Sequence, residues 1–461
     1  MTRLLTLALF LASLAGCTSL SRDGGEQEVR ATANRMMDHP EASTDTTTRA
    51  QLRQELLRAP LTIEGAVALA LLNNPGLDRT FAELRLTEAQ VVAATRPRNP
   101  GISIGRLERG DEKETERSVV FDLIGLLTLP ARAPMEKRRY EAAKLQAVQA
   151  VLTLARDTRL AFVETLGAQQ RARYAADVVD AAEAGRDLAR RLAEAGNFSR
   201  LDAAREQAFY ATAAAQRAQA EAAALAAREE LIRRLGLTDA RQLQLPERLP
   251  DLPTSVRDIG DVEQQALDQR VDVRMAKAQA ESTARGLRLT KTTRFINVLD
   301  LGFESNTSNE ASRQTGYEVS LELPLFDFGR TRNAQAEAVY RRALAEVAET
   351  AVNARSEART AYALYHSNYA LARHYRDEVV PLQKQISDEV LLRYNGMLVS
   401  TFEVLIQARE QVASTNAYLA ALQDFWIAEA MLYSTLQGVG GSPTFTLSSD
   451  DESAGRPAAR H

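Results

Sequence analysis

Residue types that commonly carry catalysis or bind metal ions are scarce in this chain. It contains one cysteine and four histidines, and the histidines lie far apart, at His39, His366, His374 and His461, without ligand spacing. There is no Gly-rich phosphate loop ending in Lys-Ser/Thr and no His-Glu-x-x-His or Cys-x-x-Cys motif. We therefore predict no catalytic site, no metal site and no cofactor, so the protein is not expected to be an enzyme.

The single cysteine, Cys17, stands where a lipid could be attached. Arg3 supplies a positive charge, an apolar run over residues 4–14 follows, and Leu14-Ala15-Gly16 precedes the cysteine. This pattern is typical of a secretory signal, too short to remain as a membrane span, and it resembles the lipobox of bacterial lipoproteins. Several acyl chains on one residue would anchor a protein stably in a membrane, whereas a single acyl chain gives only marginal membrane binding. The alternative is an ordinary signal peptide followed by a chance cysteine; Thr18, where an Asp would resemble an inner-membrane retention signal, favours the outer membrane.

Net charge and the lengths of the apolar runs further restrict the class of protein. The 461 residues have a formal net charge of −4, so no overall positive field points to nucleic acid as a partner. Outside the signal, no apolar run approaches the roughly 20 residues of a transmembrane helix. If the mature protein enters a membrane, we expect it to do so with strands.

Apolar residues at helical spacing predict long helices. The spacings of 3 and 4 mark core-facing stripes such as Leu419, Leu422, Trp426, Ala430 and Tyr433. An Ala-rich helix predicted over residues 132–195 would reach about 95 Å at about 1.5 Å per residue. A helix of that length needs partners along its whole length, as in a coiled coil or a barrel of helices.

Alternating apolar and polar residues predict four short strands. They lie within residues 102–105, 119–124, 299–304 and 317–325, in segments of about 9–11 residues, the length of a tilted membrane strand. The segments between them, 110–117 and 306–316, are strongly polar and are predicted to be loops. A water-soluble hairpin with one buried face is the alternative interpretation of the alternation alone.

The order of these elements repeats with an offset of 196 to 198 residues, which indicates duplication of a whole unit. Each unit has a helix, two strands, a long helix, a break and a further helix. The predicted domains are a signal peptide (1–16), a lipidated tether (17–60), a first repeat (61–235), a linker (236–257), a second repeat (258–437) and a disordered tail (438–461). The fold class is therefore mainly α with a small β part.

Four strands cannot close a barrel, and open strand edges in lipid leave backbone groups unpaired at several kcal/mol each. The strands must then be pooled between identical chains. Two chains would give eight strands and a filled interior, whereas three would give twelve and room for a channel.

With the duplication in place, the sequence resembles the TolC (outer membrane factor) family over residues 61–438. The resemblance rests on Leu-Thr-Ile-Glu-Gly-Ala at 61–66, on Asn73-Asn74-Pro75, and on Leu-Pro-Leu-Phe-Asp-Phe-Gly-Arg at 323–330. It implies a homotrimer with a 12-stranded barrel in the outer membrane and a periplasmic α-barrel of coiled-coil hairpins. It also implies a passive efflux duct that meets a periplasmic adaptor (membrane fusion) protein and an inner-membrane pump, of the RND type.

The resemblance also suggests gate residues near the helix-hairpin tips. Glu403 matches an acid that faces the pore in the family, and Asp202 is its counterpart in the first repeat. Tyr394 matches a tyrosine of an inter-helix latch. Ile406 and Val399 stand where a second acid and the basic latch partner would lie, so a double acidic ring and the same latch are not expected. The alternative for each acid is a first-turn charge favoured by the helix dipole.

Small and apolar residues at the tips suit docking of the adaptor. They are Gly196, Phe198, Gly396, Met397 and Leu398. The alternative is that Phe198 and Leu398 staple the hairpins internally.

The cargo follows from similarity alone. Arg393-Tyr394-Asn395-Gly396 and Gln423-Asp424-Phe425-Trp426 resemble the heavy-metal-efflux branch of the family, although no Met or His ladder accompanies them. The competing hypothesis is a structural trimeric coiled-coil lipoprotein or adhesin without transport activity.

Overall fold

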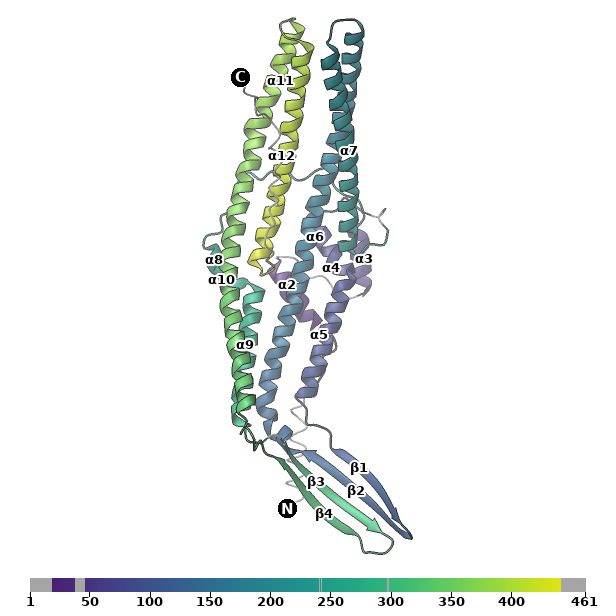
Figure 1. Ribbon diagram of the computed structural model, residues 1–461, viewed down its shortest axis with the longest axis vertical. Coiled ribbons are helices and arrows are strands. Elements are labelled where there is room, and N and C mark those ends of the chain that lie inside the picture. The colour runs from purple at the N-terminus through teal and green to yellow at the C-terminus, as the bar shows by residue number, and fades with distance from the viewer. Residues whose placement is uncertain (1–18, 38–45, 240, 242, 297, 441–461) are drawn as a thin grey trace, which may run out of the picture.

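A computed structural model describes residues 19–37, 46–239, 241, 243–296 and 298–440. The molecule is elongated, with a β-sheet at one end and two helical hairpin tips at the other (Figure 1). Cys17, the signal peptide and most of the predicted tail lie outside the described residues. Long helices and one small sheet confirm the mainly α prediction of fold class.

The four strands form one antiparallel sheet in the order β1-β2-β3-β4. Their bounds are β1 Gly101–Arg109, β2 Glu112–Asp122, β3 Val298–Ser308 and β4 Gln314–Glu322. The sheet therefore joins a pair of strands from each half of the chain, through the pairing of β2 with β3.

The predicted loops and strand ends were partly wrong. Most of the polar segment 110–117 belongs to β2, and only Gly110 and Asp111 form the turn, with Gly110 at φ 62°. The second loop is likewise shorter than predicted, because β3 extends to Ser308 and β4 begins at Gln314. Backbone pairing such as Glu114 with Ser308 holds these polar residues in strands, a long-range contact that side-chain polarity does not report.

Strands β2 and β4 end earlier than the alternation of apolar and polar residues predicts, at Asp122 and Glu322. Leu323 and Leu325 follow the end of β4, and Leu325 lies in the turn that precedes α10. Helix α6 spans Leu123–Glu194, 72 residues, rather than beginning at residue 132. The carboxylate of Asp122 caps it by accepting from the Gly125 amide at 2.6 Å. Pro130 lies within it, so a proline in the first turns does not mark the helix start here.

Each half of the chain contributes a long helical hairpin. In the first half α6 turns into α7 (Arg200–Leu235). In the second half α10 (Arg330–His374) continues through a π-helical turn (Tyr375–Val379) into α11 (Val380–Asn395), which turns into α12 (Thr401–Leu436). The widened turn precedes Pro381, which has no N–H to donate to the helical ladder.

Shorter helices flank these hairpins. They are α2 (Glu26–Met36), α3 (Thr46–Leu56), α4 (Ile63–Asn73), α5 (Pro75–Ala94), α8 (Val262–Gln269) and α9 (Val271–Thr292). The order of two short helices, two strands and a long hairpin occurs before residue 236 and again after residue 261. Helix α6 packs against both α7 and α9, so the two halves share one body.

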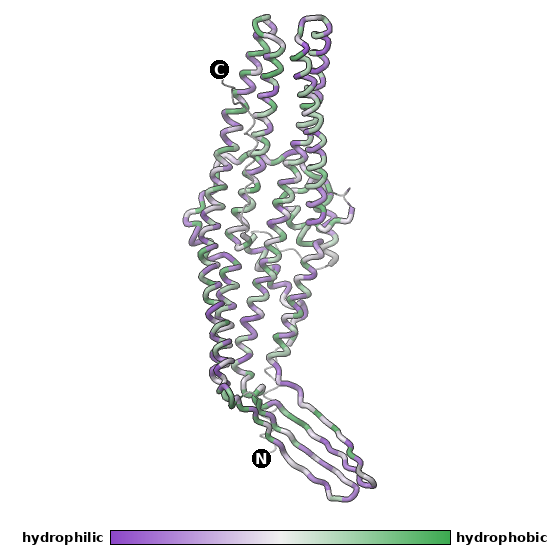
Figure 2. Tube along the Cα trace, viewed as in Figure 1, coloured by the Kyte–Doolittle hydropathy of each residue, from purple (hydrophilic) through white to green (hydrophobic). Residues whose placement is uncertain are grey.

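The main hydrophobic core lies at the waist, where the short helices meet the long ones (Figures 1 and 2). Phe162 of α6 and Phe425 of α12 are fully buried there, and the Phe425 ring stacks on Tyr365 at 5.5 Å between centroids. Helix α2 belongs to this core, because Val29 and Ala33 are buried in it. Within the predicted tether, residues 26–36 therefore form a helix that packs into this core.

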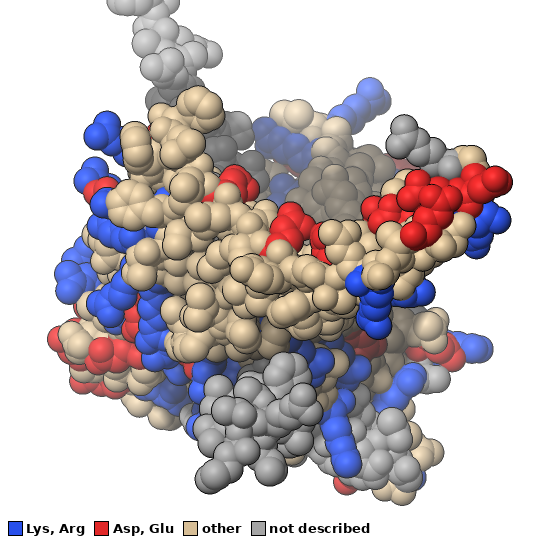
Figure 3. Space-filling view, turned by 90° about the horizontal axis from the view of Figure 1, so that it is seen from below, with Lys and Arg blue, Asp and Glu red and all other residues tan. Residues whose placement is uncertain are grey.

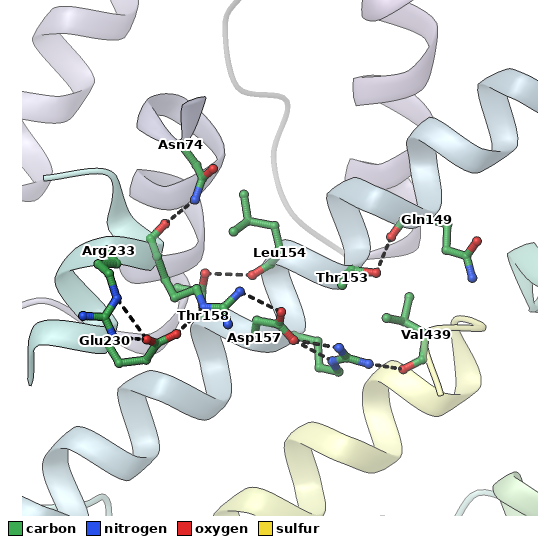
Figure 4. Close-up of polar contacts among 11 residues, drawn as sticks. Asn74, Gln149, Thr153, Leu154, Asp157, Thr158, Glu230, Arg233 and Val439 are labelled. Atoms are coloured by element: carbon green, nitrogen blue, oxygen red, sulfur yellow. Dashed lines mark hydrogen bonds and ion pairs between the residues drawn. The ribbon is translucent and has the colours of Figure 1, made fainter. Parts of the chain in front are cut away.

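A polar network ties the waist together (Figure 4). Asp157 on α6 accepts hydrogen bonds from Arg156 and, at 3.0 Å, from Arg234 near the end of α7. The Asn74 amide donates to the Arg234 carbonyl at 2.9 Å, and Arg156 donates to the Val439 carbonyl at 3.1 Å. The network thus connects the break between α4 and α5 with the ends of α7 and α12, which fixes the halves of the chain relative to each other.

Candidate functional site

The tip between α6 and α7 is built by a glycine turn and a serine cap. Gly196 has φ 78°, and a Cβ placed there would meet nothing within 4 Å. The Ser199 hydroxyl accepts from the Asp202 amide at 3.0 Å and donates to the Asp202 carboxylate at 2.6 Å. Arg205 also binds that carboxylate, at 3.0 Å. Asp202 is therefore held in a helix-capping arrangement, which is the alternative left open by the sequence.

The tip between α11 and α12 differs in its turn residue. Met397, rather than Gly396, adopts the left-handed conformation, with φ 60°. The Ser400 hydroxyl caps α12 by accepting from the Glu403 amide at 3.3 Å. The Glu403 carboxylate itself is exposed, and no described residue lies within hydrogen-bonding or ion-pair distance of it. Glu403 thus presents a free negative charge near the tip, unlike Asp202.

The apolar residues at the two tips differ in exposure. Met397 and Leu398 are 93% and 77% exposed, so Leu398 does not staple its hairpin, whereas Phe198 is half-buried. Tyr394 receives a hydrogen bond from the Thr401 hydroxyl at 3.4 Å across the same turn. In this chain Tyr394 therefore contacts its own hairpin.

The two hairpins are joined a short way behind their tips by an ion pair that the sequence analysis missed. Arg409 of α12 binds the carboxylate of Glu206 on α7, and Glu206 is buried. The Arg409 guanidinium also lies 4.6 Å from the centroid of the Phe209 ring. In the sequence, Glu206 looks like one more surface charge on a polar helix, and no local signal identifies a partner 203 residues away.

One face of the sheet is apolar and exposed over the half nearest the helices, whereas Arg106, Glu108, Lys113 and Arg117 share that face toward the turns. The register places Ile102, Val119, Phe303 and Tyr317 in one row across all four strands. The Phe121 and Phe303 rings lie 6.5 Å apart on this face, and Tyr317 is 79% exposed. An exposed apolar sheet face of this extent marks a surface that contacts lipid or another protein.

The opposite face is acidic. The register places Glu112, Glu114, Glu116, Asp122, Asp300, Glu304, Glu318 and Glu322 on it. Several of these acids lie beside glycine: Glu116 pairs with Gly105 and Glu304 with Gly316. Figure 3 looks from the sheet end and shows acidic side chains gathered beside a broad uncharged surface. The sheet thus separates an apolar face from a negatively charged one.

Other kinds of site are not evident in the part of the chain that the structure describes. No group of three or more His, Cys, Asp and Glu side chains there is arranged to hold a metal ion. Among the same residues, none of the helices combines the length and hydrophobicity needed to cross a membrane.

Comparison with known proteins gives a fold and one distant relative. No protein-family model matches the chain. The cobalt-zinc-cadmium resistance protein CzcC of Cupriavidus metallidurans is 25% identical over 282 residues, which are 58% of this chain and 64% of CzcC. The matched segment therefore spans less than two thirds of that relative.

Solved structures match over most of their length. The outer-membrane channel OprN superposes with a TM-score of 0.69 at 21% identity, covering 84% of this chain and 92% of OprN. CusC, described as forming a transmembrane channel, superposes with a TM-score of 0.67 at 18% identity, covering 82% of this chain and 92% of CusC. The Campylobacter jejuni CmeC outer membrane channel superposes with a TM-score of 0.65 at 14% identity, covering 82% of this chain and 86% of CmeC. The chain therefore has the fold of the TolC-type outer-membrane channel proteins.

Proposed function

We propose that the chain is the outer-membrane channel subunit of a tripartite efflux system, a passive duct without catalytic activity. The observation that carries the proposal is the four-stranded sheet with one apolar face, one acidic face and two outer strands, β1 and β4, that pair on one side only.

In a membrane, such a sheet would need its outer strands paired and its acidic face kept in water. Unpaired backbone groups in lipid are costly, and so are charges that face the hydrocarbon. Three copies would pool twelve strands into a closed barrel, with residues such as Tyr317 toward lipid and residues such as Glu304 toward the interior.

The long helices also need identical copies of the chain to pack against. Helix α6 alone would extend on the order of 110 Å, from its 72 residues at about 1.5 Å each. Apolar side chains remain exposed along the second-half hairpin, including Val352 at 65% and Leu382 at 56%. A homotrimer would cover them by packing the hairpins into a periplasmic tube of helices.

The acidic face supports cations as cargo. Carboxylates lining a narrow bore raise the local concentration of cations and repel anions. The likeness to a cobalt-zinc-cadmium resistance protein agrees with divalent metal cations as the substance exported.

The remaining parts of the proposal concern assembly. Lipid on Cys17 would anchor the chain in the outer membrane, with the helices in the periplasm. The exposed Met397 and Leu398 would meet a periplasmic adaptor protein, which connects the tube to an inner-membrane pump of the RND type.

The test is the conductance of the purified full-length protein in planar bilayers under a salt gradient. We expect pores whose reversal potential indicates cation preference, and we expect Glu304→Gln with Glu318→Gln to reduce that preference. Glu108→Gln is the matched control, since Glu108 pairs with Arg106 on the opposite face. A trimer that opens no pore would refute the channel and favour a structural coiled-coil lipoprotein.

A further inference from the structure

A cavity of about 930 Å³ lies at the waist of the molecule, between α12 and the short helices of the first half. Its lining comes from α2, α3, α4, α6, α10 and α12 and from the segment before α8. It is distinct from the sheet and from the hairpin tips. Its volume lies within the range of ligand-binding pockets, roughly 300–1,000 Å³.

The walls of the cavity are mostly apolar and aromatic. Val163 and Ile259 contribute aliphatic surface, and Tyr365, Trp426 and Tyr433 contribute rings. The Trp426 ring is held in place because its Nε1 donates to the Pro250 carbonyl at 3.0 Å. Such walls suit the apolar body of a ligand.

Four charged residues line the same cavity: Arg159, which is half-buried, and Glu64, Arg257 and Glu429, which are exposed at its rim. Within the described residues none of them forms an ion pair, and the Arg159 guanidinium lies 4.5 Å from the centroid of the Tyr433 ring. Burial raises the pKa of Glu429, while the two arginines act to lower it and Glu64 acts to raise it. The Glu429 carboxyl is therefore close enough to the other three charges to be influenced by them.

We propose that this cavity binds a zwitterionic amphiphile, such as a phospholipid with an ethanolamine or choline headgroup. The phosphate would meet Arg159 and Arg257, and the amine would meet Glu64 and Glu429. The tail would lie on the apolar wall, and a quaternary amine would also meet the ring of Trp426. A purely anionic or purely cationic amphiphile would meet two like charges in the same space.

The chain carries its own reporter for this proposal, because Trp426 is the single tryptophan in the sequence and lines the cavity. The titration follows Trp426 fluorescence of the full-length protein in neutral detergent. The ligands are dihexanoyl phosphatidylcholine, dihexanoyl phosphatidylglycerol with the same tails, and phosphocholine without a tail.

We expect a saturable change with the phosphatidylcholine, at least about tenfold weaker binding of the anionic lipid, and weak binding of free phosphocholine. Glu429→Gln and Arg159→Gln should each weaken binding about tenfold, and Ala68→Phe should block it by filling the cavity. Glu410→Gln, the same change at an exposed site on α12, should leave it unchanged. Equal binding of both lipids, or variants that bind as the wild type does, would overturn the proposal; the comparison of lipids needs no variant.

Discussion

The buried ion pair between Glu206 and Arg409 predicts how firmly the two hairpins are held together behind their tips. Arg409→Leu leaves the Glu206 carboxylate, whose side chain is 2% exposed, without a counter-charge. Glu206→Leu leaves a guanidinium whose side chain is still 28% exposed and can reach water. We therefore expect Arg409→Leu to be the more destabilising of the two.

The magnitude follows from the burial of the pair. Removing one partner of a buried ion pair costs about 3–5 kcal/mol. We expect Arg409→Leu to fall in this range and Glu206→Leu to fall below it. The double variant Glu206→Leu/Arg409→Leu should recover much of the loss, because two apolar side chains can pack where the ion pair lay.

Hydrogen exchange read by mass spectrometry measures this local effect. Peptides covering residues 200–212 and 403–415 should exchange roughly 10²-fold faster in Arg409→Leu, the factor that corresponds to about 3 kcal/mol. Peptides from the sheet should be unchanged. Glu221→Leu is the control, since Glu221 pairs with Arg217 on the exposed side of the same helix.

Two results would refute the reasoning. One is an Arg409→Leu protein whose tip helices exchange at the wild-type rate. The other is a double variant whose loss equals the sum of the two single losses, since independent sites add and coupled ones do not.

Four further predictions address the core, an acid on α6, the tip and the anchor. Phe425→Ala should lower the free energy of unfolding by about 3–5 kcal/mol, measured by denaturant titration, because the ring is fully buried. Glu164→Gln should stabilise the protein at pH 7: burial first, and then Glu230, raise the pKa of Glu164, so the native state binds more protons and stability falls as pH rises. Glu403→Ala should lower cation preference in bilayer recordings without unfolding α12, since only the Glu403 backbone amide caps the helix. Cys17→Ala should abolish palmitate labelling.

Each of these has a contrary outcome. A wild-type denaturation midpoint for Phe425→Ala would contradict the placement of the core. A Glu164→Gln protein with the same pH dependence of stability as the wild type would show that this carboxyl is not perturbed. Unchanged ion selectivity would leave Glu403 with a role in the first helical turn only, and unchanged labelling would reject the lipobox interpretation.

The sequence was sufficient to predict the helices and strands, because these depend on the periodic spacing of apolar residues close together in the chain. Spacings of 3 and 4 placed the long hairpins, and the break at Gly196 was located because a left-handed turn favours glycine. Alternation found all four strands, and their lengths of 9 to 11 residues agree with the prediction. These signals are local because each side chain's direction is fixed by its neighbours within one or two turns.

Only the tertiary structure decided which residues meet across the chain. The register of β2 on β3 brings Glu116 and Glu304 onto one face, although nearly 190 residues separate them. The local pattern likewise did not reveal the partner of Glu206, the strand character of residues 112–117 or the packing of α2 into the waist. The physical reason is that local spacing sets the direction of a side chain, whereas its partner is chosen by pairing and burial between segments distant in sequence.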